Sequence, residues 1–221
     1  MSDCCDPREY GRTFSDRFAR RVANRYRKRG LDKTAQRMVD LIAQRGLDGV
    51  TVLEVGGGVG EIQVELLKRG AARATNLELS EAYEARAQEL LVDAGLTGRV
   101  ERRIVDIATA PDEVAEADVV VLHRVVCCYP DYQKLLASVA DHARGQVVIS
   151  HPPRNLYSRI ALGVENLGFR LRRSEFRVFA HPPRAMRRVL DERGLQTTTM
   201  RSTPSWRIVS GERAPAASSG R

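Results

Sequence analysis

The chain has 221 residues, of which 43% are hydrophobic and 5% aromatic, and its formal net charge is +8. A chain of this length forms one domain with at most one elaboration, and its core must be mainly aliphatic. It contains no apolar run near the ~20 residues of a membrane span, and we expect no signal peptide. Its four cysteines form two adjacent pairs, Cys4-Cys5 and Cys127-Cys128, which is not a disulfide framework, so we expect a cytoplasmic protein.

The first predicted element is a basic helix within residues 1–30. Its apolar residues recur every four positions, which is the spacing of one helix face: Phe14, Phe18, Val22 and Tyr26. Arginines surround this face, and Gly30 ends the helix. A second helix, from Asp32 to Arg45, leads into the first strand. Because the first helix lies outside the strand–helix alternation that follows, we predict that it is a lid over the substrate.

The run from Thr51 to Gly60 predicts a buried strand that ends in a glycine turn. Glycines allow the backbone to approach a ligand closely, because a Cβ would block both the turn and the contact. A helix from Glu61 to Arg69 follows the turn. The next strand, Arg73 to Glu78, ends in a carboxylate roughly 20 residues after Gly56, which is where a ribose-binding acid is expected. As a strand-tip residue, Glu78 should lie outside the core.

Strands and helices continue to alternate after Glu78. Ser80 is the predicted cap of the helix after the second strand. Three further strands are predicted: one before Val105, one from Ala117 to His123 and one from Gln146 to Ser150. Two helices follow, from Leu156 to Leu171 and from Pro183 to Arg193, and then two strands, from Gln196 to Arg201 and from Ser205 to Val209. The short link between the last two strands, which holds Pro204, predicts a hairpin.

This order predicts an α/β protein with a doubly wound, Rossmann-like fold. The sheet should have seven strands, mostly parallel, with an antiparallel edge strand and an N-terminal helical lid. We predict three regions: the lid at 1–30, a cofactor-binding domain at 31–213, and a disordered tail at 214–221. The helix after the fifth strand should complete the lid with its apolar residues Leu156, Ile160 and Val164.

The residues around the glycine turn discriminate between nucleotides. A dinucleotide fingerprint has its third glycine one position later and aims a helix N-terminus at a pyrophosphate. Here Gly56, Gly58 and Gly60 follow Glu54, which lies two positions before the first glycine. An anionic Glu54 would repel a phosphate but attract the ammonium and sulfonium charges of S-adenosyl-L-methionine. We therefore predict S-adenosyl-L-methionine as the cofactor.

Four motifs, in this order, resemble those of the class I S-adenosylmethionine-dependent methyltransferases: Glu54 to Gly60, Leu77 to Ser80, Val105 to Ile107 and Ala117 to His123. The resemblance implies that the glycine turn, including Gly57, passes beneath the methionine part of the cofactor. It implies that Glu78 binds the ribose and Asp106 the adenine amino group. Contacts to the adenine ring are implied for Leu79, Ile107 and His123.

Further short motifs resemble the magnesium-protoporphyrin O-methyltransferase-like branch and its uncharacterised bacterial relatives. They are Tyr129-Pro130, Ile149 to Pro153, Phe179 to His181 and Tyr26 to Leu31. The resemblance implies methyl transfer to a small molecule, at oxygen. It does not extend to the tetrapyrrole substrate, because Cys128 stands where the porphyrin enzymes have a histidine.

Methyl transfer from a sulfonium depends mainly on in-line positioning. A carboxylate acceptor needs no base, whereas a hydroxyl acceptor needs one. By position, His123 is the first candidate base and His151 the second, with Tyr129 as a substrate contact. Each histidine also has a structural interpretation, in which His123 covers the adenine and His151 holds a loop. We interpret Cys127 and Cys128 as inert, buried side chains.

The basic residues leave two other functions open. An RNA methyltransferase would use the arginines of the first helix, of Arg170 to Arg173 and of Arg184 to Arg188, but these lack the interleaved aromatic residues of a stacking platform. An acidic small substrate or an anionic membrane surface would also explain them. A non-catalytic cofactor-binding module is the third possibility. Adjacent cysteines lack the spacing that lets two thiolates reach one zinc ion, so we predict no metal.

Overall fold

The computed structural model describes residues 10–11 and 13–214, so the Cys4-Cys5 pair and nearly all of the predicted tail lie outside the described residues. Its helices are α2 (Asp16–Arg29), α3 (Lys33–Ala43), α4 (Glu61–Lys68), α5 (Glu84–Asp93), α6 (Tyr132–Asp141), α7 (Leu156–Leu171) and α8 (Pro183–Glu192). Its strands are β1 (Thr51–Val55), β2 (Arg73–Glu78), β3 (Val100–Ile104), β4 (Ala117–Leu122), β5 (Ala143–His151), β6 (Leu195–Thr203) and β7 (Trp206–Arg213). Short 3-10 turns include η1 (Glu81–Tyr83) and η4 (Val126–Cys128).

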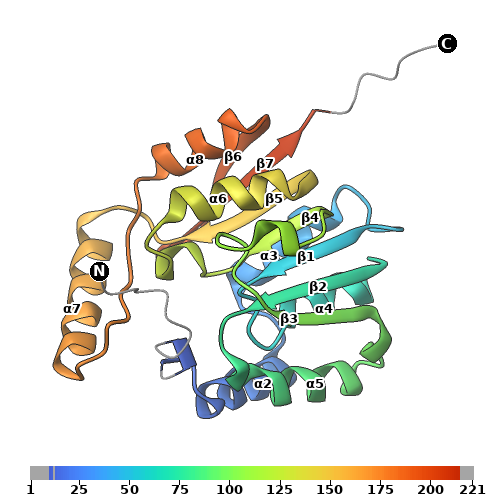
Figure 1. The fold of residues 1–221 in the computed structure, drawn as a ribbon, viewed down its shortest axis with the longest axis horizontal. Coiled ribbons are helices and arrows are strands. Elements are labelled where there is room, and N and C mark those ends of the chain that lie inside the picture. Colours follow the sequence, from blue (N-terminus) through green and yellow to red (C-terminus); the bar gives the residue numbers. More distant parts are fainter. Residues whose placement is uncertain (1–9, 12, 215–221) are drawn as a thin grey trace.

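The seven strands form one sheet in the order β3-β2-β1-β4-β5-β7-β6, which confirms the predicted doubly wound fold (Figure 1). Strands β1 to β5 pair in parallel. Strand β7 runs antiparallel to both β5 and β6, so it is inserted beside the edge strand β6. The direction of winding reverses between β1 and β4. The crevice at the carboxyl ends of these two strands is therefore the expected ligand site.

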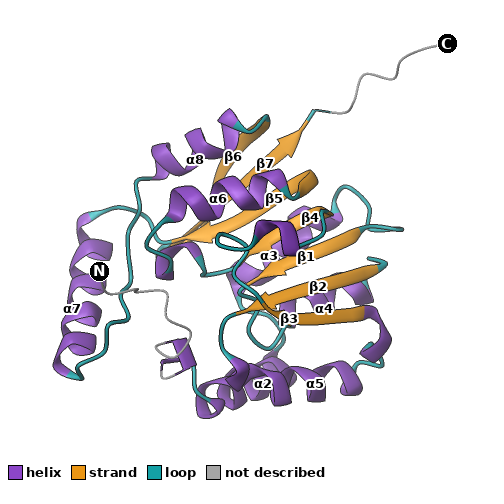
Figure 2. Ribbon diagram, viewed as in Figure 1, coloured by secondary structure: helices purple, strands orange, loops and turns teal. Residues whose placement is uncertain are grey.

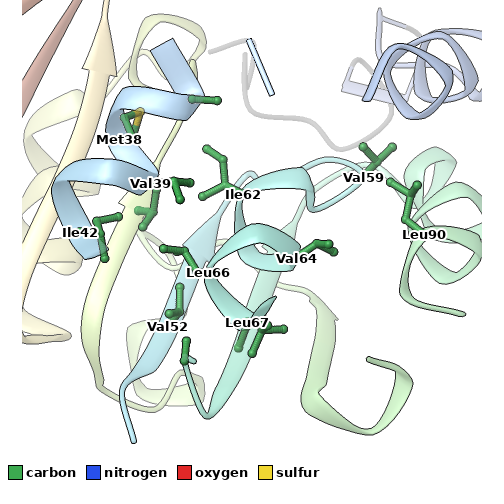
Figure 3. Close-up of a cluster of buried hydrophobic side chains, with 14 of the residues drawn as sticks. Met38, Val39, Ile42, Val52, Val59, Ile62, Val64, Leu66, Leu67 and Leu90 are labelled. Atoms are coloured by element: carbon green, nitrogen blue, oxygen red, sulfur yellow. The ribbon is translucent and has the colours of Figure 1, made fainter. Parts of the chain in front are cut away.

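The core consists of two layers, one on each face of the sheet (Figure 2). Alternate residues of a strand point to opposite faces, so Val119 and Val121 of β4 join one layer while Val120 and Leu122 join the other. Helices α3, α4 and α5 cover the first face, and α6 and α8 cover the second. Figure 3 shows part of the first layer, in which Val39 and Ile42 of α3 lie beside Ile62 and Leu66 of α4.

The predicted cap of the helix after β2 is wrong. The Ser80 side chain makes no cap hydrogen bond. Its Oγ donates instead to the backbone oxygen of Phe14, 3.1 Å away, and so ties the N-terminal segment to the end of β2. Three caps form elsewhere among the described residues: Asp32 accepts from the N–H groups of Thr34 and Ala35 to start α3, Asp131 accepts from Lys134 N–H to start α6, and Asn155 accepts from Ser158 N–H to start α7. Short polar side chains at these positions satisfy donors that a helix leaves unpaired.

Helices α2 and α7 pack against the body very differently. Helix α2 buries Ala19, Ala23 and Tyr26 in the first core layer. Helix α7 buries only Ser158 and lies at the side of the molecule, away from the sheet (Figure 1). Within the described part of the chain, neither these nor any other helix is long and apolar enough to cross a membrane.

We predict that Ala23→Leu lowers the free energy of unfolding by about 1–3 kcal/mol, because added methyl groups overpack a fully buried site. The neighbouring change Asn24→Leu serves as the control, since Asn24 is exposed. Denaturant melts of the two variants and the parent protein measure the difference. Equal stability of both variants would mean that α2 is not packed on the body as described.

Candidate active site

A cavity of about 510 Å³ opens at the carboxyl ends of β1, β2 and β4. All the residues predicted to bind the cofactor except Gly60 line it: Glu54, Gly56, Gly57, Gly58, Glu78, Leu79, Asp106, Ile107 and His123. Gly60 instead starts α4 with a φ of 82°. The cavity therefore gathers residues from motifs that are far apart in the sequence.

The glycine turn between β1 and α4 takes the conformation that its sequence predicts. Gly56, Gly58 and Gly60 have φ values of 63°, 56° and 82°, which side-chain-bearing residues rarely adopt. Gly57 has a different constraint, because a Cβ at this position would lie 2.1 Å from Nδ2 of Asn76. The positive φ angles of three glycines and the crowding at Gly57 together keep this wall of the cavity free of side chains.

Glu78 is buried, contrary to the expectation for a strand-tip residue. Its Oε2 accepts from Gly58 N–H at 2.8 Å, and its Oε1 accepts from the N–H groups of Leu79 at 2.8 Å and Ser80 at 3.2 Å. Burial raises the pKa of Glu78, and the three backbone donors oppose that shift. The carboxylate thus holds the glycine turn and the end of β2 in one fixed arrangement.

Asp106 and Tyr129 form a hydrogen-bonded pair on the cavity wall. The hydroxyl of Tyr129 donates to Oδ2 of Asp106 at 2.9 Å, while Oδ1 accepts from Ala108 N–H at 2.9 Å. Ile107, which follows Asp106, is buried beside them. Tyr129 therefore orients the carboxylate that the sequence assigns to the adenine.

Two buried glutamates, Glu54 and Glu61, have pKa values that change the charge expected for this wall of the cavity. Burial raises the pKa of Glu54 to about 8, and the nearby charge of Glu61 adds to the shift. Burial also raises the pKa of Glu61 to about 7, although Arg25 lies 2.8 Å away and opposes the shift. Glu54 is therefore largely protonated near neutral pH in the ligand-free chain, rather than anionic as the sequence-based argument assumed. Its Oε2 accepts from Gln63 N–H at 3.1 Å.

An ionic network that was not predicted from the sequence lines the cavity, built from Asp32, His123 and Arg124. Oδ2 of Asp32 lies 2.8 Å from Arg124 and 3.4 Å from Nε2 of His123. Burial raises the pKa of Asp32, but hydrogen bonding to His123 and the charge of Arg124 outweigh it and hold this pKa well below its usual value. The Arg124 guanidinium also lies 4.9 Å from the ring centre of Trp206. The Asp-Lys-Thr-Ala pattern marks Asp32 as a helix cap, but no local signal links it to Arg124.

Both ring nitrogens of His123 are engaged within the protein. Nδ1 lies 3.0 Å from Oγ of Ser150, and Nε2 faces Asp32. Burial lowers the pKa of His123. His123 thus lines the cavity as part of the network, with no ring nitrogen left for an acceptor in this arrangement.

The other predicted catalytic histidine lies apart from the cavity. His151 is buried, its Nδ1 lies 2.9 Å from the oxygen of Pro152, and it is not among the cavity-lining residues. His181 is similarly remote and places Nε2 2.9 Å from the oxygen of Tyr129. Cys127 and Cys128 do line the cavity, as free thiols whose Sγ atoms are 3.7 Å apart. Burial and the neighbouring Cys127 raise the pKa of Cys128, which keeps that thiol protonated.

Another wall of the cavity is mainly apolar and aromatic. Its lining comes from the N-terminal segment, α2, α7 and the segment before α8: Tyr10, Phe14, Phe18, Val22, Leu162 and Val178. Phe14 anchors this wall, with ring centres of Phe18 and Tyr83 at 5.8 and 6.2 Å. The predicted lid residues of α7 are not part of it. Leu156, Ile160 and Val164 point to solvent, and Leu162 and Glu165 of the same helix face the cavity.

A family model described as a methyltransferase domain matches residues 18–200. The chain therefore belongs to the methyltransferase-domain family and is an S-adenosylmethionine-dependent methyltransferase of class I, as the four sequence motifs predict. A search among curated proteins found no match to this sequence.

Solved structures of methyltransferases share the fold. The magnesium protoporphyrin IX methyltransferase of Synechocystis PCC 6803, with bound S-adenosylhomocysteine, is 22% identical, with a TM-score of 0.66 over 82% of this chain and 83% of its own. An O-methyltransferase family protein from Burkholderia thailandensis is 19% identical, with a TM-score of 0.70 over 91% of this chain and 61% of its own. A family 2 O-methyltransferase from Planctomyces limnophilus, in complex with apigenin, is 17% identical, with a TM-score of 0.65 over 90% and 62%. The resemblance to the porphyrin branch is thus confirmed at the level of the fold.

We predict that the buried Glu54 makes the protein less stable as pH rises. Its folded-state pKa of about 8 exceeds the 4.5 of a free glutamate, so the folded chain binds more protons between these values and loses stability across that window. Glu54→Gln keeps an acceptor for Gln63 N–H but cannot ionise. Melting temperatures from pH 5 to 9 should therefore fall less steeply for Glu54→Gln than for the parent. Glu81→Gln, at an exposed carboxylate, should leave the slope unchanged.

Proposed function

We propose that the protein transfers the methyl group of S-adenosylmethionine to an oxygen atom of a small, largely apolar molecule. One observation carries the proposal: a single cavity joins the bare glycine turn to a wall of aromatic and aliphatic side chains. Its volume is in the range of small-molecule sites, which are mostly apolar with a few polar groups. Two structural neighbours are O-methyltransferases, which favours oxygen as the accepting atom.

The proposed cofactor contacts fit the cavity. Gly56 to Gly58 form a wall without side chains, against which a ligand chain can lie. Glu78 is fixed by backbone donors at the tip of β2, in place to accept the ribose hydroxyls. Asp106, which is held by the Tyr129 hydroxyl, would accept from the adenine amino group, and Leu79 and Ile107 would sandwich the ring. When bound, S-adenosylmethionine supplies an activated methyl group on a positively charged sulfur.

The protein's own contribution is positioning and the exclusion of water. Transfer requires the acceptor oxygen to lie in line with the departing sulfur, and such alignment can supply about 7–11 kcal/mol. Phe18 and Val22 of α2 and Leu162 of α7 form apolar walls of the cavity, and these walls would keep water from the acceptor. We propose on this basis that α2 covers the substrate, as expected of the 1–30 region.

The acceptor oxygen is proposed to be acidic, such as a carboxylate or an acidic hydroxyl. Among the described residues that line the cavity, His123 is the one histidine, and both of its nitrogens are engaged. Cationic Arg21 of α2 also lines the cavity and suits a negatively charged acceptor. We therefore propose that His123 holds Asp32 in place rather than acting as a base.

Ion pairs on α2 support a small acceptor over RNA. Arg27 lies 2.8 Å from Asp93 and 3.4 Å from Glu89, both on α5, and Arg20 lies 3.1 Å from Asp16. These arginines are candidates for phosphate contacts in the sequence, but carboxylates of the same chain partly neutralise their charge.

We predict that Glu78→Ala weakens S-adenosylmethionine binding by about tenfold or more, from loss of roughly 1.5–3 kcal/mol per charge-assisted hydrogen bond. Calorimetry on the parent should show micromolar binding of S-adenosylmethionine and far weaker binding of NAD. The same change leaves three backbone donors without an acceptor, so it should also lower the melting temperature. Titrations are therefore run where circular dichroism shows both proteins folded, with Glu81→Ala as the control. Unchanged affinity in folded Glu78→Ala would refute the ribose contact.

The proposed function is tested with S-adenosylmethionine carrying a radiolabelled methyl group and a metabolite extract as acceptor. Label should enter the small-molecule fraction, and nuclease treatment should not reduce it. Label that appears in RNA and disappears with nuclease would contradict the proposal. Absence of transfer to any fraction, despite tight cofactor binding, would favour a binding module.

The same assay tests the role of His123. We predict that His123→Gln reduces the rate by less than about tenfold, because an amide can still bond Ser150 or Asp32, and that the pH–rate profile keeps its shape. Loss of a general base would cost about 10²–10⁴-fold. A loss of that size would restore the catalytic role predicted from the sequence.

A further inference from the structure

Helix α7 exposes a continuous apolar stripe. Six large apolar residues on this helix are 55% to 77% exposed: Leu156, Tyr157, Ile160, Val164, Leu167 and Leu171. Their spacing of mostly three or four residues places them along one side of the helix. Contiguous apolar surface of this kind marks a site of contact with another molecule or with lipid.

The stripe faces away from the protein. The side of α7 that meets the body carries Ser158, Leu162 and Asn166, whose side chain bonds both the N–H and the oxygen of Val178 at 2.8 Å. Each of these residues lies two positions from a residue of the stripe, and two positions correspond to about 200° around a helix. The stripe therefore cannot seal the cavity while α7 keeps these contacts.

The chain around the stripe is strongly basic. Residues 154–177 contain six arginines and two glutamates, which leaves +4, half of the formal net charge of the whole chain. Arg159 and Arg170 project from the helix beside the stripe and are exposed. Two copies of the chain that paired through α7 would bring these like charges together, which opposes association. An anionic surface is complementary in charge.

We propose that α7 docks on an anionic lipid surface. The helix lies in the plane of the interface, with the stripe among the acyl chains nearest the headgroups and the arginines among the headgroup phosphates. Amphipathic helices with arginine-rich polar faces bind membranes in this way without crossing them. Leu162 and Glu165, on the opposite side of α7, line the cavity. Docking through α7 thus brings the side of the cavity that Leu162 lines close to the lipid.

The test is co-sedimentation of the full-length protein with vesicles. An equal mixture of phosphatidylcholine and phosphatidylglycerol should retain the protein, phosphatidylcholine alone should retain far less, and added salt should weaken retention. Ile160→Ser combined with Val164→Ser should reduce the apparent affinity for mixed vesicles by about tenfold or more. Val92→Ser is the matched control, because Val92 on α5 is as exposed as Val164, at 65%. Circular dichroism and cofactor titration check that each variant is folded.

Three results would overturn the proposal. The first is no retention by mixed vesicles of a protein that light scattering shows to be monomeric. The second is a dimer that the double variant dissociates, which would assign the stripe to a second copy of the chain. The third is retention that salt abolishes but the double variant leaves intact, because binding would then rest on charge alone.

Discussion

The rest of the site depends on the absence of side chains in the turn between β1 and α4. Three of its glycines hold backbone conformations that other residues rarely adopt, and Gly57 is crowded by Asn76 beneath it. This turn lies at the point where the sheet reverses its winding, which is where open α/β sheets bind ligands. Gly58 donates to Glu78, so the turn also fixes the carboxylate at the neighbouring strand end. The cofactor end of the cavity is in this way a single rigid unit.

The charge of this rigid unit depends on what lies beside its two buried acids. Glu54 and Glu61 lie near each other out of water, and their pKa values are raised for that reason. A positively charged ligand placed beside them would favour their ionised forms. Arg25 from α2 moderates the effect through its pair with Glu61. Helix α2, which we propose covers the acceptor, thus also takes part in the electrostatics of the glycine-turn end of the cavity.

Local sequence signals predicted the fold and the residues that line the cavity at the carboxyl ends of β1 and β2. The glycine turn, Glu78 and the Asp106 motif can each be predicted from a few neighbouring residues, because each lies directly at the end of a strand. The Asp32–His123–Arg124 network was missed because it joins segments that become neighbours only through folding. Ser80 was misread for the same reason, as the distant oxygen of Phe14 competes for its hydroxyl. The orientation of α7 also lay beyond the sequence, because an amphipathic pattern shows that a helix has two faces but not which one the body covers.

Because the glycine turn has no room for side chains, the parts of the protein differ in how much substitution they tolerate. A methyl group at Gly56 would lie 2.5 Å from Val125, and one at Gly60 would lie 2.3 Å from Gln63, so the cofactor end has almost no room to vary. The apolar wall, which we propose meets the acceptor, is built differently, from single side chains such as Phe18, Leu162 and Val178 that come from separate elements. Redesign for a new acceptor therefore has a defined target: side chains of the apolar wall can change in volume while the glycine turn stays as it is.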